Sequence, residues 1–515
     1  MDWRGNLNLL LLLKNNMKKI FLSIIIFILI LLALFPRSVE VLNGNPIFGF
    51  DQGRDYLEVK DIVNNHKLTL IGAELGAGEA GVSYIFQGPG FYYLLSIPYI
   101  LFHGNPAGSI YLMWVLSMLS LVIGFFIGIT IWGKLGGVIL TTLLAVSSPL
   151  INQARFEWNA NATAFFILLT FYSVYLFIKT KQNRFILLSA FLSGFLYNFE
   201  FAVAIPLCLG FIILTPYICR KKFSQYFLLF VGFFLAFSPM FLFEVRHGFM
   251  GIKSFISYLL HVPKNEITML SRWTHFQDVW NTFVFNFANT FPGNGVLPVI
   301  ILLLIFFGLF IWYLLQEKDM VRKTFNLYVG SLIPLSFIIF NIFRNSIYQH
   351  YILELNVAYI IMLTSIVMFI ITQNYKKTML VFTAYGIILL SFAAYSSYKT
   401  TTYDYKDYGG TAKLKGKVDA LDYVYNDAKG KPFGLFVFSP PIYTYPYDYI
   451  ILWHEEPRYH YLPGQTKKGT FYLLIEPDGS KPWSYNGWLE TVIKSGKIIY
   501  TKTLPSGFIV QKREG

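Results

Sequence analysis

Long apolar runs separated by short polar segments fill most of residues 20–397 of this 515-residue chain. A helix needs about 20 apolar residues to cross the roughly 30 Å hydrocarbon core of a bilayer. Backbone groups in lipid must pair within their own segment, so runs of this length are expected to form helices. Only 14% of the residues are charged, whereas about a quarter are charged in soluble domains. The chain is therefore predicted to be a polytopic α-helical membrane protein within the lipid bilayer.

About eleven runs are candidate membrane spans. They are residues 20–36, 107–133, 136–152, 158–178, 185–199, 201–218, 224–243, 296–315, 325–343, 351–372 and 379–397. The apolar segment 91–103 is shorter and contains Pro98, so we expect an interfacial helix or half-helix there and no further span. The first run follows three lysines, as in a signal peptide, but no small-residue cleavage site follows it. We expect an uncleaved span.

The distribution of Lys and Arg orients these spans, because basic residues favour cytoplasmic loops. With 91–103 outside the membrane, the basic clusters fall on one side: Arg4, Lys14, Lys18, Lys19, Lys134, Lys179, Lys181, Arg184, Arg220, Lys221, Lys222, Lys318, Arg322, Lys323, Lys376 and Lys377. The opposite loops are longer yet hold fewer: Arg37, Arg54, Lys60, Lys67, Arg155, Arg246, Lys253, Lys264, Arg272 and Arg344. We expect residues 1–19 in the cytoplasm, the C-terminus outside, and the protein in the plasma (inner) membrane. This asymmetry accounts for the net charge of +14, so no nucleic-acid partner is predicted.

Three extracytoplasmic regions are large: residues 37–106, residues 244–295, and the tail 398–515. The tail has the pattern of a soluble α/β domain, with a helix over 417–428 and strands at GLFVFS, YIILWH, TFYLLIE, KIIYTKT and GFIVQK. The two cysteines lie in or beside one apolar run, so no disulfide framework is implied. The motifs GxxxxGK[ST], HExxH, CxxC and GxSxG are absent from the sequence.

The first extracytoplasmic loop carries a group of carboxylates in FGFDQGRDYLEVKD. If the stretch is helical from about Gln52, Asp55 and Glu58 share a face. An acidic helix N-terminus would explain these carboxylates equally well. Asp51 differs because it follows an apolar pair near the membrane surface, where partial burial would raise its pKa toward that of a general base.

Five further segments follow this acidic residue along the chain and carry a family resemblance. They are GPGFYYLL (88–95), FHGNPAG (102–108), SSPLINQARFEWNANATAFFILL (147–169), SPMFLFEVRHGF (238–249) and YQHYILELNVAYI (348–360). Together with the topology, this order resembles the C-type integral membrane glycosyltransferases. It is most similar to family 39, which includes protein O-mannosyltransferases and the aminoarabinose transferase of lipid A. The resemblance covers about 20–400 and implies inverting transfer of a sugar from a polyprenyl-phosphate donor to an extracytoplasmic lipid, glycan or protein.

The resemblance also implies roles for individual residues. Asp51 matches the acidic residue of the first loop, which deprotonates the acceptor hydroxyl or helps to position a divalent metal ion. Where the family often has Asp-Glu, this chain has Asp51-Gln52, so Asp55 is the candidate second catalytic carboxylate. The family's second acidic position falls on Glu157 or Asn159.

The Gln and His that the family commonly shows near the end of its fifth span are replaced here by Asn198 and Glu200. Substrate preference therefore does not carry over at those two positions. Tyr92 and Tyr93, next to the GPG segment, are candidates for substrate-proximal contacts, as are Glu157 and Glu354. The other aromatic residues are expected to form core and interfacial belts.

A lipid phosphate leaving group gains charge in the transition state, so cations aimed at it lower the barrier. Candidate donor-phosphate ligands near the extracytoplasmic membrane edge are Arg155, Arg246, Arg344 and His350. Snorkelling at the interface is the alternative role for each arginine. Glu354 lies one turn inside a span, where a carboxylate costs roughly 2–3 kcal/mol. We therefore expect it to face a cavity or to pair with Arg246 or Arg344.

Two other classes of protein remain as alternatives. A flippase for polyprenyl-linked sugars would need polar midplane residues and often shows two similar halves, yet the sequence shows no repeat and no midplane charge beyond Glu354. A non-catalytic scaffold that binds through the tail would not need carboxylates at the membrane surface. The glycosyltransferase hypothesis is therefore favoured, with the sugar, the acceptor and any metal ion left open.

Overall fold

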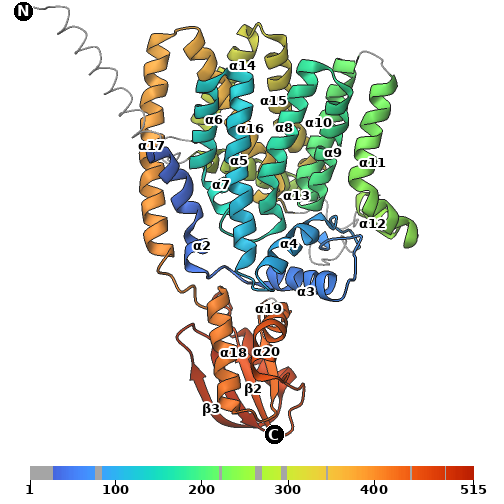
Figure 1. The fold of residues 1–515 in the computed structure, drawn as a ribbon, viewed down its shortest axis with the longest axis vertical. Helices are drawn as coiled ribbons and strands as arrows, with labels where there is room; N and C mark the ends of the chain where they lie inside the picture. The colour runs from blue at the N-terminus through green and yellow to red at the C-terminus, as the bar shows by residue number, and fades with distance from the viewer. Residues whose placement is uncertain are drawn as a thin grey trace, which may run out of the picture.

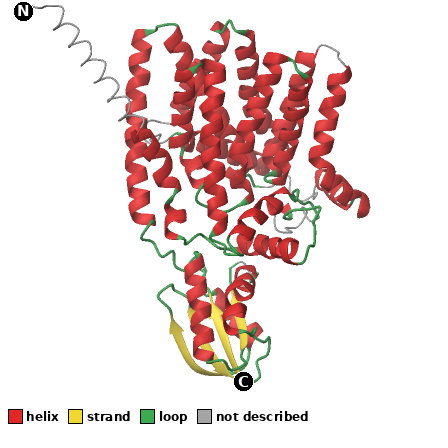
Figure 2. Ribbon diagram, viewed as in Figure 1, coloured by secondary structure: helices red, strands yellow, loops and turns green. Residues whose placement is uncertain are grey.

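The computed structural model describes residues 27–75, 84–219, 223–260, 269–291, 299–343, 346–440, 443–481 and 483–515. A helical bundle makes up most of the molecule, and a small α/β domain lies at one end of it (Figure 1). Strands occur only in that small domain in the described part of the chain (Figure 2). We call the end of the bundle that carries the α/β domain the domain end, and the opposite end the far end.

In the described part of the chain, eight helices are long and apolar enough to cross a membrane. They are α5 (Gly108–Trp132), Asn159–Thr180 with α8 (Thr163–Thr180), α10 (Phe201–Cys219), α11 (Phe223–Arg246), α14 (Val299–Gln316), α15 (Met320–Ile342), Gln349–Thr372 with α16 (Leu353–Thr372), and α17 (Lys376–Asp404). The other three predicted spans fall on shorter helices: Phe27–Arg37, α6 (Lys134–Val146) and α9 (Asn183–Phe195). The predicted class, a polytopic helical membrane protein, is confirmed, whereas the count of eleven spans stays a prediction.

The chain reverses direction from one long helix to the next, so the turns after α5, α8, α14 and α16 all lie at the far end (Figure 1). Those turns carry the described basic clusters: Lys134, Lys179, Lys181, Arg184, Lys318, Arg322, Lys323, Lys376 and Lys377. The side that the sequence predicts to be basic is therefore one physical end of the bundle, opposite the α/β domain. Within the bundle, α16 is the central helix, since it packs against α6, α8, α13, α14 and α15.

Short helices cover the domain end of the bundle. They are α2 (Val39–Asn43), α3 (Phe50–Asn64), α4 (Gly90–Leu101), α7 (Ser148–Gln153) and α12 (Met250–Leu260). As predicted for 91–103, α4 does not cross the bundle but lies beside α3 at its end (Figure 1). The predicted loop 244–295 contains two helices, α12 and α13 (Met269–Thr290), and α13 packs against α14, α15 and α16.

The α/β domain contains a four-stranded sheet in the order β1-β2-β4-β3. β1 (Gly434–Phe438) is parallel to β2 (Thr470–Ile475), whereas β4 (Ile509–Glu514) is antiparallel to both β2 and β3 (Lys497–Thr503). Alternate residues of β2 point to opposite faces, as in any strand. Tyr472 and Leu474 join the main core with α18 (Leu414–Ala428), and Phe471 and Leu473 join a second cluster with Ile493.

Four of the five predicted strands form, but the strand predicted at YIILWH is wrong. These residues lie in α19 (Tyr445–Ile450) and in the π-helical turn η7 (Ile451–Glu455). Pro446 at the first turn presets a helical φ, and the Thr444 hydroxyl donates a hydrogen bond to Asp448 at 2.9 Å. The apolar residues Tyr447, Ile450 and Ile451 then recur at helical spacing and are buried.

Short contacts attach the α/β domain to the domain end of the bundle. The hydroxyl of Tyr449 donates a hydrogen bond to the carbonyl of Gly104 at 2.5 Å. A Cβ on Gly53 of α3 would come within 2.6 Å of the Pro446 Cα, so glycine permits the close approach of α3 and α19. The Phe48 amide also donates to the Ala412 carbonyl at 3.1 Å, which joins the loop before α3 to the segment before α18.

Candidate active site at the domain end

The first turn of α3 brings two aspartates and one arginine together. Arg54 Nη1 lies 2.9 Å from Asp51 Oδ1, and Arg54 Nη2 lies 2.7 Å from Asp55 Oδ1. Residues three and four apart on a helix are neighbours, so the spacing of Asp51 and Arg54 produces this contact directly. The side chain of Asp51 is 35% exposed and that of Asp55 only 1%. Asp51 is therefore the more accessible of the two carboxylates.

The electrostatics of this group differ from those of an exposed acidic helix start. Burial raises the pKa of Asp55 to about 6, with Arg54 opposing the rise and Asp51 adding to it. Burial acts to lower the pKa of Arg54, but the carboxylates of Asp55 and Asp51 outweigh it and raise that pKa. The guanidinium therefore stays charged and holds the two carboxylates in place.

Glu157 lies close to this cluster, from the loop before α8. Its side chain is fully buried, and neither carboxylate oxygen has a hydrogen-bond partner among the described residues. Burial raises its pKa well above the ordinary value, with Asp55 and Asp51 adding to the rise. Gln52 Nε2 donates to the backbone carbonyl of Glu157 at 2.7 Å and thereby holds this loop against α3.

Glu157 rather than Asn159 is the residue whose side chain faces the aspartates. The Asn159 amide is used elsewhere: it donates to Gln87 Oε1 and, at 2.8 Å, to the carbonyl of Phe199. These bonds join three loops at the domain end. Sequence reasoning left the choice between Glu157 and Asn159 open, and only the three-dimensional contacts distinguish them.

The GPG segment fixes α4 against the end of α9. The Gly90 amide donates to Asn198 Oδ1 at 2.9 Å, and a Cβ on Gly90 would lie 2.8 Å from Asn198 Cγ. With α4 held in this way, Tyr92 is buried beside Arg54 and Asp55, and burial followed by the Asp55 charge raises its pKa. Tyr93 points elsewhere, since its hydroxyl donates to the carbonyl of Thr69 at 2.7 Å.

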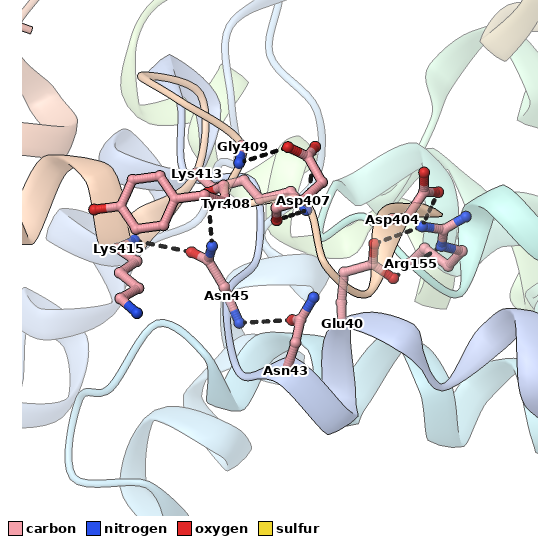
Figure 3. A network of polar contacts seen from close by, with 10 residues as sticks. All are labelled: Glu40, Asn43, Asn45, Arg155, Asp404, Asp407, Tyr408, Gly409, Lys413 and Lys415. Atoms are coloured by element: carbon pink, nitrogen blue, oxygen red, sulfur yellow. Dashed lines mark hydrogen bonds and ion pairs between the residues drawn. The ribbon is translucent and has the colours of Figure 1, made fainter. Parts of the chain in front are cut away.

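Arg155, predicted to bind the donor phosphate, is already paired with two carboxylates. Its Nε and Nη2 donate to the two oxygens of Glu40 at 2.8 and 2.7 Å, and Nη2 also donates to Asp404 Oδ2 at 2.7 Å. Figure 3 shows these three residues joining α2, the loop after α7 and the end of α17. In this structure Arg155 therefore anchors the last membrane helix.

The same region fixes the segment between α17 and α18 (Figure 3). Asn45 Nδ2 donates to the carbonyl of Tyr408 at 3.0 Å, and the Lys415 amide donates to Asn45 Oδ1 at 2.9 Å. The Gly409 amide donates to Asp407 Oδ1 at 2.9 Å. The loop after α2 thus holds the connection to the α/β domain at a defined position.

Among the described residues, neither Arg246, His350 nor Glu354 forms a hydrogen bond or ion pair with the aspartate cluster. Arg246 is exposed at the end of α11. The His350 ring lies edge-on to Trp158 at 4.5 Å between centroids, next to the residue that follows Glu157. Glu354 is fully buried and accepts a hydrogen bond from the Ser336 hydroxyl at 2.8 Å. Ser336 is a neutral partner, whereas the sequence led us to expect an arginine or a cavity. Arg344 lies outside the described residues.

The structure of the whole chain is similar to solved structures of one membrane protein, ArnT. No family model matches the chain, and no curated protein matches it in sequence. The crystal structure of ArnT from Cupriavidus metallidurans bound to undecaprenyl phosphate is similar, with a TM-score of 0.55 and 11% identity over 95% of this chain and 97% of that one. This chain therefore has the same fold as that ArnT structure. ArnT in the apo state gives a TM-score of 0.50 at 8% identity over 97% and 98% of the two chains.

The similarity to ArnT extends over the α/β domain as well as the helical bundle, because it covers nearly the whole of both chains. At these identities the likeness establishes the fold, and the roles of individual residues rest on the contacts described above. Within the described residues, Asp51, Asp55 and Glu157 do not converge closely enough to act as three ligands of one metal ion.

Proposed function

We propose that this chain is a glycosyltransferase that moves a hexosyl or pentosyl group from a polyprenyl-phosphate donor to an extracytoplasmic acceptor. The acceptor would be a hydroxyl of a lipid, a glycan or a protein. The observation that supports this most strongly is the Asp51–Arg54–Asp55 cluster at the domain end of a C-type glycosyltransferase fold. The similar ArnT structure contains undecaprenyl phosphate, which supports a polyprenyl phosphate as the lipid partner.

In the proposed reaction Asp51 acts as the general base. The acceptor hydroxyl gives its proton to the Asp51 carboxylate while the hydroxyl oxygen attacks the anomeric carbon of the donor sugar. The bond from that carbon to the phosphate oxygen breaks, and its electron pair leaves with the polyprenyl phosphate. Attack from the face opposite the leaving group inverts the anomeric configuration.

The neighbouring residues position the base and the leaving group. Arg54 holds Asp51 through the 2.9 Å contact, and its second bond to buried Asp55 fixes the guanidinium. Arg246 does not contact this cluster, but it is exposed and stays the predicted cation for the donor phosphate, since charge-assisted hydrogen bonds stabilise a phosphate that gains charge. Arg155 could take that role only by releasing Glu40 or Asp404.

The proposal includes an orientation in the plasma (inner) membrane. Residues 1–19 and the basic far end would face the cytoplasm, because positive loops are retained there. The domain end, with Asp51 and the domain from about residue 398, would then face outward. α17 continues to Asp404, so this boundary falls within its last turns.

The test is to incubate the purified protein in lipid nanodiscs with labelled polyprenyl-phosphate sugars and a panel of acceptors. Release of polyprenyl phosphate, together with labelled acceptor, is the expected result. Movement of the intact donor across the bilayer without cleavage would instead identify a flippase. If no donor is cleaved or moved, the proposed function is wrong and the scaffold role is favoured.

A further inference from the structure

A second group of ionisable side chains lies in the α/β domain, away from the aspartate cluster. Asp422 comes from α18, and His454 and Glu455 are consecutive residues of the π-helical turn η7. One ligand atom from each of the three can be chosen so that all lie within 4.8 Å of one another. Among the described residues, this is the group whose side chains converge in the way that metal ligands do.

Glu455 is the residue that most needs a partner. Its side chain is fully buried, and neither carboxylate oxygen has a hydrogen-bond partner among the described residues. Burying a carboxylate without a partner is costly, so such a group is normally protonated, paired or bound to a metal.

The distance between His454 and Asp422 also fits an ion. His454 Nε2 is buried without a hydrogen-bond partner and lies 3.7 Å from Asp422 Oδ2. That separation is too long for a hydrogen bond. It is close to the spacing of about 3.4 Å expected between two ligands of a tetrahedral zinc ion with bonds of about 2.1 Å.

The hydrogen bonds that Asp422 accepts from other residues leave its Oδ2 oxygen open. Arg458 Nη1 donates to Asp422 Oδ1 at 2.7 Å, and the Tyr459 hydroxyl donates to the same oxygen at 3.3 Å. The other oxygen, Oδ2, is the one directed toward His454. The ion pair with Arg458 therefore orients the carboxylate without occupying the oxygen that would bind an ion.

We propose that Asp422, His454 and Glu455 bind one divalent transition-metal ion of the zinc class, with a water molecule as the fourth ligand. One imidazole nitrogen and two carboxylate oxygens are a donor set that zinc accepts. Calcium and magnesium prefer sites built from oxygen alone. Isolated π-helical turns are frequent at functional sites, and here the turn supplies two consecutive ligands.

The ion would stabilise the part of the α/β domain that packs against α3, the helix that carries Asp51. η7 continues directly from α19, and α19 packs closely against α3 at Gly53. An ion that joins η7 to α18 would therefore fix the surface on which α3 and Asp51 rest. This site does not depend on the proposed sugar transfer, so either proposal can fail without the other.

The test uses the full-length protein in detergent, stripped with a chelator and titrated with Zn²⁺ by calorimetry. We expect one equivalent to bind and the thermal unfolding temperature to rise. Glu455→Gln and His454→Gln should each weaken binding by more than about 100-fold, since even residues outside the ligand set cost 10–100-fold. Both variants should lose the thermal shift.

Two controls make the result specific. His460→Gln changes an exposed histidine a few residues further on and should bind Zn²⁺ as the wild type does. Asp51→Asn should also bind normally, which excludes Asp51 as a zinc ligand. The proposal is wrong if the wild type binds no Zn²⁺, or if folded Glu455→Gln and His454→Gln both keep wild-type affinity. Gel filtration establishes that each variant is folded.

Discussion

The charged residues at the start of α3 differ mainly in how much water reaches them. Asp51 is partly exposed, Asp55 is almost completely buried, and Glu157 is fully buried without a hydrogen bond among the described residues. Arg54 contacts the first two, which leaves Glu157 as the carboxyl that most favours the protonated form. We therefore propose that Asp51 carries out the proton transfer and that Glu157 has a neutral, packing role.

This assignment predicts a pH effect on stability. A carboxyl whose pKa is raised in the folded state binds more protons folded than unfolded, so stability falls as the pH rises above the unfolded value of 4.5. Glu157→Gln removes that proton. Between about pH 5 and pH 7, the thermal unfolding temperature of Glu157→Gln should fall less than that of the wild type. In this range each pH unit lowers the wild type's free energy of unfolding by up to about 1.4 kcal/mol.

Thermal unfolding of the two proteins in detergent at several pH values measures this difference. Asp61→Asn, which changes an exposed carboxylate on the same helix, is the control and should follow the wild type closely. Parallel pH profiles for the wild type and Glu157→Gln would contradict the assignment of a raised pKa to Glu157.

Part of this residue-scale description could be predicted from the sequence. The grouping of Asp51, Arg54 and Asp55 follows from helical spacing within a few residues. The approach of Gln52 to the Glu157 backbone spans 105 positions, and the pairs of Arg155 with Glu40 and Asp404 span 115 and 249. No local pattern encodes contacts of that separation, so the role of Arg155 as an anchor could not be inferred.

At the scale of elements, the helix α4 is defined by what it packs against. The sequence excluded it as a span because of its length and Pro98, and the structure places it beside α3. In contrast, YIILWH was interpreted as a strand because its residues are β-branched and aromatic. Local propensity did not decide its structure, since Pro446 and the contact between Tyr449 and Gly104 favour a helix there.

The close packing of α4 predicts a difference between two glycine substitutions. Gly90→Ala places a Cβ 2.8 Å from Asn198 Cγ, so either α4 or the buried Asn198 side chain must shift. The expected cost is about 1–3 kcal/mol of stability. Gly386→Ala, in α17, meets nothing within 4 Å and should be neutral or stabilise the helix by up to about 1 kcal/mol.

The two variants can be compared by thermal unfolding in the same detergent. Equal unfolding temperatures for Gly90→Ala and Gly386→Ala would show that the contact between α4 and Asn198 does not constrain the protein. The same comparison tests the position of α4, because a helix elsewhere would not place Gly90 against the end of α9.

At the scale of the whole molecule, alternating helices place the basic turns at one end and the α/β domain at the other (Figure 1). The sequence predicted this separation from charge alone, because the positive-inside rule acts on every short loop together. It could not predict how the α/β domain packs on α3, since that depends on shape complementarity around Gly53 and Gly104.

The proposed orientation predicts which cysteines a membrane-impermeant thiol reagent can label in intact cells. Lys431→Cys places an exposed thiol in the α/β domain, and Lys318→Cys places one at the far end. With Cys208 and Cys219 replaced by alanine, the first should react from outside and the second only after the membrane is permeabilised. The reverse labelling would overturn the orientation.

The most direct test of the central claim compares Asp51→Asn with the wild type in the donor-cleavage assay. Asp61→Asn serves as the matched control on α3, and all three proteins are checked for equal folding by thermal unfolding. If Asp51 is the general base, Asp51→Asn should lower the rate of sugar transfer by at least about 100-fold, while Asp61→Asn keeps wild-type activity. Wild-type transfer by folded Asp51→Asn would contradict the account.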